Sequence, residues 1–296
     1  MDIDFIGMPL MAGASVSGMD QAPAYIRQIG LETLFTHHVL CDIGDVRCDN
    51  NSMSTNSQMK HLTSVLRSCE HLHNQVVESL KANHFPLVFG GDHSLSWGSI
   101  GGVAEVFKEL GIIYIDAHGD FNTKETSITH NVHGMHKAYL MGLGHMDVND
   151  IKDVQYSENC VCHQNVFFVG SRALDDGELL FAKEKKLNIY SSQDIIRQGA
   201  SKVASSIISS VRKKGIKHVH ISFDVDVIDP FIFPGTGVPE KDGINLVDVE
   251  SLLSMFLTEL PICSMDFVEF NPLLDKNNKS LSCCVDLLHV IDDKLV

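Results

Sequence analysis

Metal-ligating residue types follow an apolar, β-branched run at 112–115. Asp116, His118 and Asp120 come next, each two residues after the last. Alternate side chains of an extended strand lie on the same face, so these three point the same way if the strand continues through them. Carboxylates gathered in this way are costly to desolvate unless a cation lies among them. The stretch therefore predicts one wall of a metal site.

Two further apolar runs end in the same kind of residue. The run at 220–223 leads into Asp224 and Asp226, and the run at 86–89 leads through a Gly-Gly pair and an aspartate to His93. For a single aspartate, a solvated cap at the end of a strand is the simpler interpretation. Ligand chemistry at three separate strand ends instead favours a polynuclear metal site assembled from all three.

The candidate ligands indicate the kind of ion and its chemistry. They are His93, Asp116, His118, Asp120, Asp224 and Asp226. Carboxylate oxygens with some imidazole nitrogen, and no thiolate, suit Mn²⁺, Mg²⁺ or Fe²⁺ better than a structural zinc ion. The carboxylates require about four positive charges, which two divalent ions provide. Two ions about 3.5–4 Å apart can convert a bridging water into hydroxide at neutral pH, so the predicted chemistry is hydrolysis.

The elements that must position these ligands alternate between strands and helices. Apolar residues recur at helical spacing over 58–83, and one long helix is expected at 193–214. Such alternation with short connections predicts an α/β fold, in which helices cover both faces of a mostly parallel sheet. Ligands of these sheets collect at the carboxyl ends of the strands. Neither a linker nor an internal repeat interrupts the pattern, so residues 1–296 are expected to form a single domain.

Composition restricts the partners. The chain has 296 residues and a formal net charge of −15, which argues against nucleic acid and is compatible with a cationic small molecule. The N-terminal residues do not resemble a secretory signal, and no apolar run is long enough to span a bilayer. We therefore expect a cytoplasmic protein without a membrane partner. Its eight cysteines are expected to be reduced there.

Four motifs resemble those of the ureohydrolases, the family that includes arginases, agmatinases and formiminoglutamate hydrolases. They are Gly-Gly-Asp-His-Ser at 90–94, Asp-Ala-His-Gly-Asp at 116–120, Ser-Phe-Asp-Val-Asp at 222–226 and Met-Asp-Phe-Val-Glu-Phe-Asn-Pro at 265–272. The resemblance implies a three-layer α/β/α sandwich, a binuclear manganese centre and a homotrimer or hexamer. Many relatives have alanine at the position of Gly119, and we expect the two small residues to be interchangeable there.

The resemblance also assigns roles in catalysis. It implies that the six candidate ligands hold two Mn²⁺ ions and that a hydroxide bridging them attacks the guanidinium carbon of the substrate. Asp120 would pass the hydroxide proton to the leaving amine, and His133 would shuttle protons. Glu269 would face the guanidinium group, which a carboxylate can bind through two hydrogen bonds. Without the motifs, His133 reads as a solvated loop histidine and Glu269 as a surface residue.

Among guanidino compounds, the resemblance favours L-arginine, hydrolysed to L-ornithine and urea. The residues that match contacts to the substrate's α-carboxylate and α-ammonium groups are Asn122, Ser127, Thr129, Asn131, Asp175 and Glu178. Ala173 departs from the pattern, since many arginases have aspartate there. The polar residues could instead be ordinary loop residues, and Asp175 could also cap the helix that follows it.

Other functions remain open at this point. Agmatinase and formiminoglutamate hydrolase are the alternatives within the family. A catalytically silent homologue that binds or regulates a partner is an alternative of another class, but the complete ligand set favours an enzyme. A metal-dependent deacetylase of related fold is disfavoured, because the two paired-ligand motifs predict two ions rather than one.

Overall fold

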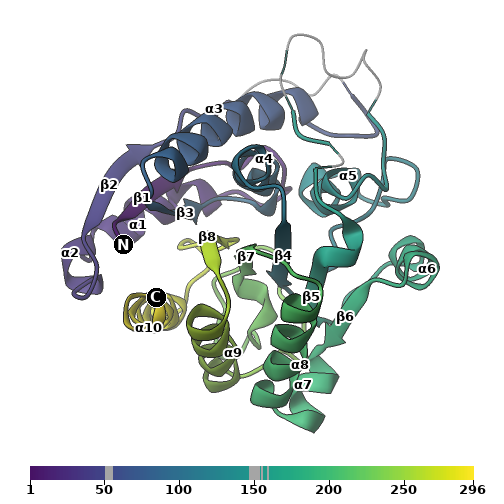
Figure 1. Cartoon of the computed structure of the whole chain (residues 1–296). Coiled ribbons are helices and arrows are strands. Elements are labelled where there is room, and N and C mark those ends of the chain that lie inside the picture. Colours follow the sequence, from purple (N-terminus) through teal and green to yellow (C-terminus); the bar gives the residue numbers. More distant parts are fainter. Residues whose placement is uncertain (51–55, 147–153, 155, 159) are drawn as a thin grey trace.

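The computed structural model describes residues 1–50, 56–146, 154, 156–158 and 160–296. Within these residues the strands form one sheet in the order β2-β1-β3-β8-β7-β4-β5-β6, and every neighbouring pair is parallel (Figure 1). The strands are β1 (Ile3–Met8), β2 (Leu40–Asp45), β3 (Phe85–Gly90), β4 (Leu110–Ile115), β5 (Val166–Ser171), β6 (Asn188–Ser191), β7 (His218–Asp224) and β8 (Ile262–Val268). The predicted parallel sheet is confirmed.

Helices cover both faces of this sheet. They are α1 (Ala22–Arg27), α2 (Leu31–Leu34), α3 (Leu62–Lys81), α4 (Ser96–Val106), α5 (His136–Leu140), α6 (Asp176–Lys185), α7 (Ser192–Gln198), α8 (Ala200–Lys213), α9 (Leu246–Glu259) and α10 (Lys279–Lys294). Single 3₁₀ turns include η2 (His93–Leu95), η3 (Val132–Gly134) and η5 (Val225–Val227). Figure 1 shows α3, α4 and α5 on one side of the sheet and α7 to α10 on the other.

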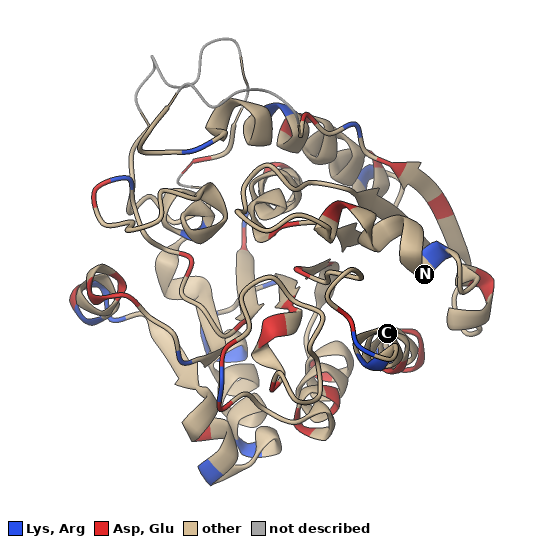
Figure 2. Ribbon diagram, turned by 180° about the vertical axis from the view of Figure 1, so that it is seen from behind, with Lys and Arg blue, Asp and Glu red and all other residues tan. Residues whose placement is uncertain are grey.

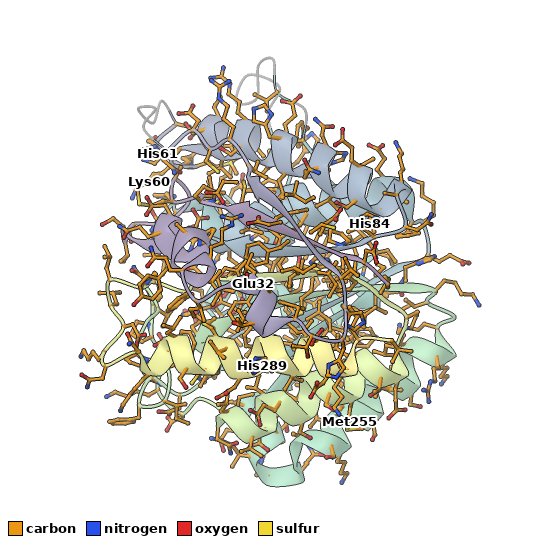
Figure 3. All side chains as sticks on the ribbon, turned by 90° about the vertical axis from the view of Figure 1, so that its left-hand side faces the viewer. Glu32, Lys60, His61, His84, Met255 and His289 are labelled. Atoms are coloured by element: carbon orange, nitrogen blue, oxygen red, sulfur yellow. The ribbon has the colours of Figure 1, made fainter. Side chains whose placement is uncertain are left out.

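Alternation of side chains along each strand separates two apolar cores. In β4, Ile112 and Tyr114 pack with residues of α3 and α4, whereas Ile113 and Ile115 pack with residues of α8 to α10. This is the side-chain period of two that a strand imposes. The side view in Figure 3 shows the two layers, with α3 above the sheet, His289 of α10 below it, and Glu32 of α2 next to α10. The three-layer α/β/α architecture is therefore confirmed.

The expected long helix at 193–214 is instead two helices. Helix α7 ends at Gln198, and α8 begins at Ala200. Gly199 between them has φ +89° and ψ 143°, a backbone conformation that residues with a side chain rarely adopt. The apolar spacing on the two sides of the glycine is helical, but the chain changes direction at this residue. The prediction of one continuous helix was wrong for that reason.

The four strands followed by the motifs are neighbours in the sheet. In the order β3-β8-β7-β4, each strand carries one motif at its carboxyl end. Glycine at the end of β3 lets the chain pass close to the segment that follows β1, since a Cβ atom built on Gly91 would lie 1.7 Å from the backbone oxygen of Leu10. A side chain there would push the turn that carries His93 away from the sheet.

Acidic residues are widely distributed over the molecule, as the net charge of −15 indicates. Figure 2 shows Asp and Glu on helices of both layers and on loops in the middle of the molecule. None of the described helices is long and apolar enough to cross a membrane. Each of the eight cysteines lies in the described residues and is a free thiol.

Candidate metal centre

The first motif reaches the site through a bend rather than a continued strand. Strand β4 ends at Ile115, and His118 then forms an isolated parallel bridge with Ala173. Asp120 has φ +55°, so the chain turns sharply at the third ligand. The three side chains do converge, as predicted, but the reason is this loop geometry. The condition that the strand continues through Asp120 is not met, because β4 ends just before the first ligand.

Four candidate ligands form a group that we call the His93 subsite: His93, Asp116, Asp120 and Asp224. The Nδ1 atom of His93 lies 3.2 Å from a carboxylate oxygen of Asp116 and 3.1 Å from one of Asp120 and one of Asp224. Asp120 is partly accessible, whereas the other three residues are buried. His93 and Asp224, which are 131 positions apart in the sequence, thus meet at the Nδ1 atom of His93.

The hydrogen bonds of His93 test whether this group fits a metal ion. Its Nε2 atom lies 2.9 Å from Oγ of Ser222, which accepts the ring N–H if Nε2 carries the proton. Nδ1 is buried and has no hydrogen-bond partner although three carboxylate oxygens surround it. An imidazole fixed from one side with a free nitrogen facing carboxylates is the usual arrangement of a histidine ligand. The residues therefore fit a divalent cation.

Asp116, His118 and Asp226 form a second group, the His118 subsite. His118 Nδ1 lies 2.8 Å from Oδ2 of Asp226. The other oxygen of Asp226 accepts a hydrogen bond from the backbone N–H of Ala117 at 3.1 Å. Asp116 belongs to both subsites, so the two adjoin each other. This sharing is what a pair of neighbouring ions requires.

Two residues of α5 that the sequence analysis did not single out also face the His93 subsite. Lys137 is fully buried, donates a hydrogen bond to Oδ2 of Asp116 and lies 3.3 Å from Oδ2 of Asp120. Burial by itself lowers the Lys137 pKa, but the charges of Asp116 and Asp120 outweigh it and raise that pKa above its ordinary value. The available signal was a lysine within an otherwise apolar helical stretch.

His136, the neighbour of Lys137, is buried as well. Its Nδ1 atom donates to the backbone oxygen of His133 at 2.8 Å, while Nε2 has no partner. One of its nitrogens lies within 4.8 Å of ligand atoms of His93 and Asp120. His136 therefore adds a further imidazole at the rim of the His93 subsite.

Glu269 and His133, the two predicted catalytic residues outside the ligand set, contact each other. Oε1 of Glu269 lies 3.1 Å from Nδ1 of His133 and accepts the backbone N–H of His93 at 2.9 Å. Burial alone lowers the His133 pKa, but the hydrogen bond and charge of Glu269 outweigh it and raise the pKa to about 9. Neither residue is the free surface group that an isolated reading of the sequence would suggest.

A cavity of about 420 Å³ opens over the two subsites. Its walls contain every residue that the sequence analysis assigned to substrate or catalysis, together with four of the ligands: Asn122, Ser127, Thr129, Asn131, Asp175, Glu178, His133, Glu269, His118, Asp120, Asp224 and Asp226. The remaining ligands, His93 and Asp116, lie beneath them and are buried. The cavity is strongly acidic, which suits a cationic ligand.

Asp175 and Glu178 also stabilise the loop that forms one wall of this cavity. Glu178 accepts hydrogen bonds from the backbone N–H groups of Phe121 and Asp175, both at 2.9 Å, and so completes a capping box at the start of α6. Asp175 accepts a hydrogen bond from Asn122 at 2.8 Å. The expected helix cap is thus present at the cavity wall. Burial raises the Glu178 pKa to about 7.

Gly119 lies against the carboxylate group of Glu178. A Cβ atom built on Gly119 would lie 2.5–2.7 Å from the carboxylate atoms of Glu178. Glu178 cannot move away without loss of its two backbone hydrogen bonds. Whether alanine is tolerated here therefore depends on how far Glu178 can shift, and the expectation that the two small residues are interchangeable stays a prediction.

A buried polar network supports His93 from behind. Ser222 lies 3.2 Å from Oγ of Ser96, which donates to Asp266 at 2.9 Å, and Ser99 donates to the same oxygen at 2.6 Å. Asp266 comes from the motif that also supplies Glu269, on β8. The motif therefore supports the backbone of His93 through Glu269 and its ring through the network that contains Asp266.

Comparison with known proteins identifies the family. The model of the Arginase family matches residues 1–291. The arginase of Bacillus subtilis is 35% identical over 288 residues, which cover 97% of this chain and 96% of that protein. The chain belongs to the arginase family.

Solved structures place this arginase-family chain among enzymes. The crystal structure of the Bacillus subtilis arginase has a TM-score of 0.89 at 34% identity and covers all of both chains. That of Entamoeba histolytica arginase in complex with L-ornithine has a TM-score of 0.88 at 25% identity and covers 98% of each chain. Membership of the arginase family makes this chain a metal-dependent hydrolase that acts on guanidino groups.

Proposed function

We propose that this chain hydrolyses L-arginine to L-ornithine and urea. The observation that carries the proposal is the acidic cavity over two adjoining ligand groups in a chain 35% identical to an arginase over nearly its whole length. An acidic cavity favours a substrate with a guanidinium group at one end and an ammonium group at the other. The L-ornithine complex of the Entamoeba histolytica relative supports a ligand of this size and charge.

The cofactor that we propose is a pair of Mn²⁺ ions. His93, Asp120, Asp116 and Asp224 would hold one, and Asp116, His118, Asp224 and Asp226 the other. Bound divalent ions supply a water of lowered pKa as the nucleophile at neutral pH. The unpartnered Nδ1 of His93 among carboxylate oxygens supports metal ligation there. Carboxylate-rich sites with imidazole favour manganese over the softer metals.

The remaining catalytic work falls to side chains around the cavity. Glu269 is positioned by its contacts with His93 and His133, and its carboxylate would orient the guanidinium group. Asp120, at the partly accessible edge of its subsite, would transfer a proton to the leaving amine. His133 lines the same cavity and would exchange protons between this amine and solvent.

The outer wall of the cavity would recognise the amino-acid end of the substrate. Asn122, Ser127, Thr129 and Asn131 offer hydroxyl and amide groups to the α-carboxylate. Asp175 and Glu178 offer carboxyl oxygens to the α-ammonium group. Agmatine has no α-carboxylate, so these polar groups would remain without a partner from that substrate, which supports the choice of arginine.

One assay tests the substrate. Purified protein supplied with Mn²⁺ is incubated separately with L-arginine, agmatine and formiminoglutamate, and the nitrogenous products are measured. We expect urea and ornithine from L-arginine, and a kcat/KM at least about 100-fold lower with the other two compounds. Agmatine leaves the polar groups of the outer wall unpaired, and formiminoglutamate brings carboxylates but no guanidinium group into an acidic cavity. Turnover of agmatine without turnover of L-arginine would contradict the proposal.

We further propose a single domain spanning residues 1–296, a cytoplasmic location and a homotrimer or hexamer. One continuous sheet containing strands from Ile3 to Val268 supports the single domain. Light scattering of the purified protein measures the mass of the oligomer. A mass equal to one subunit would contradict the proposed homotrimer or hexamer.

A further inference from the structure

A buried ammonium group contacts two ligands of the His93 subsite. The Lys137 side chain has no exposed surface, and within the described part of the chain no other lysine or arginine is buried. Its Nζ atom contacts Asp116 and Asp120, and it lies 4.6 Å from the centre of the Tyr114 ring. A lysine is held in such a position only where carboxylates compensate for its lost hydration.

The contacts of Lys137 are unequal between the two subsites. It shares Oδ2 of Asp116 with His93, whose Nδ1 atom lies 3.2 Å from that oxygen. The His118 subsite instead faces Oδ1 of Asp116, which lies 3.8 Å from His118 Nδ1. Lys137 also contacts Asp120, which belongs to the His93 subsite alone. The ammonium group is therefore associated with the His93 subsite.

The position of Lys137 affects how the charges of the ligand carboxylates are neutralised. The ligand set carries four carboxylates, so two divalent ions alone would already neutralise it. Lys137 adds one more positive charge against the same oxygens. A divalent ion entering the His93 subsite must share Asp116 and Asp120 with the ammonium group and is repelled by it. An ion in the His118 subsite keeps His118 and Asp226, which Lys137 does not contact.

We propose that Lys137 is an internal cation of the His93 subsite, which neutralises Asp116 and Asp120 in the metal-free protein and weakens the binding of a divalent ion there. The inference rests on the proposed function only in that the clustered carboxylates bind metal, and it does not depend on which guanidino compound is the substrate.

Lys137→Met tests the proposal because methionine fills a similar volume without charge. The matched control is Lys108→Met, since Lys108 donates to the backbone oxygen of Ala104 and does not belong to either subsite. Chelator-stripped proteins are titrated with Mn²⁺ alone by calorimetry, and bound manganese is counted by elemental analysis. We expect wild type to bind a second equivalent at least about tenfold more weakly than the first.

In Lys137→Met, the second equivalent should bind at least about tenfold more tightly than in wild type, and Lys108→Met should match wild type. The metal-free Lys137→Met protein should also melt at a lower temperature than metal-free wild type, because its buried carboxylates lose their cation. Its melting temperature should rise more on addition of Mn²⁺ than that of wild type.

A second equivalent of Mn²⁺ that binds no more tightly to Lys137→Met than to wild type would overturn the proposal. If the metal-free variant does not fold, both proteins are loaded with Mn²⁺ and the loss of manganese to a chelator is followed. Slower loss of the second ion from Lys137→Met supports the proposal, and equal loss contradicts it. Arginine turnover is measured separately, so tighter metal binding by Lys137→Met in a protein without turnover would contradict only the proposed substrate.

Discussion

At the scale of single residues, the carboxylate of Glu269 joins the cavity to the His93 turn. One of its oxygens accepts the backbone N–H of His93 and faces the ring of His133. Glu269 itself has φ +66°, so the backbone after β8 is held in a conformation that is uncommon for a residue with a side chain. The position of this carboxylate thus depends on its partners, and its charge in turn controls the pKa of His133.

Glu269→Gln tests that electrostatic control. Glutamine retains a carbonyl oxygen for the His93 N–H but removes the charge that, against burial, raises the His133 pKa to about 9. In the metal-free variant, the His133 pKa measured by NMR titration should fall by at least about one unit. A His133 pKa that stays near 9 would show that Glu269 is not its cause.

The contact between Glu269 and His133 makes the unfolding free energy of the protein depend on pH. A histidine whose folded pKa exceeds its ordinary value stabilises the protein fully below about pH 6.5, and this contribution disappears as the pH rises through about 9. Between these values the metal-free wild type should lose up to roughly 3 kcal/mol of unfolding free energy, and Glu269→Gln should lose less. Denaturant titrations at several pH values measure the difference between the two proteins.

At the scale of elements, the first turn of α6 and the loop after β4 are held by one side chain. Glu178 binds the backbone of Phe121 in the loop and of Asp175 at the helix start. Both segments form the wall of the cavity. The capping box therefore positions the proposed substrate contacts as well as stabilising the helix.

Gly119→Ala should disturb this connection. The added Cβ atom meets the Glu178 carboxylate, and displacement of that group should cost about 1–3 kcal/mol because two backbone N–H groups lose their acceptor. In a Glu178→Ala background the same substitution should cost less than about 0.5 kcal/mol, since the clash is absent. Urea denaturation of the four proteins measures the coupling, and additive costs would contradict the mechanism.

At the scale of the whole molecule, Asp292 connects the last helix to the first quarter of the chain. From α10 its carboxylate accepts hydrogen bonds from the backbone N–H groups of Thr36, His37 and His38, at 2.6–3.1 Å. Burial alone raises the Asp292 pKa, but these hydrogen bonds outweigh it and lower the pKa to about 2. Helix α2 packs on α10 beside this contact (Figure 3).

Asp292→Asn should weaken this connection in a pH-dependent way. Because the folded pKa lies below the ordinary value, the stabilisation is present above about pH 4 and disappears as the pH falls through about 2. At pH 7 the variant should lose about 2 kcal/mol of unfolding free energy. Asp293→Asn, which alters a half-exposed neighbour, should lose less than about 0.5 kcal/mol. A loss at pH 7 that persists unchanged at pH 2 would contradict the assignment.

The sequence by itself determined the ligand chemistry and the class of fold. Residue types at the ends of apolar runs define what can bind, and the alternation of the two hydrophobic periods defines a parallel sheet between helices. These features are local, so they can be read from neighbours in the chain. The exceptions are the bend after Ile115 and the break at Gly199, where backbone conformation departs from the period on either side.

Only the tertiary structure decided which strands are neighbours and which side chains are enclosed with the ligands. Strands β7 and β8 lie between β3 and β4, although they follow them by more than a hundred residues, and this order joins the four motifs. Lys137 looks like a helix residue in sequence, and packing against Tyr114 is what encloses its ammonium group with Asp116. Local patterns do not contain such information, because burial and strand order are set by contacts between distant segments.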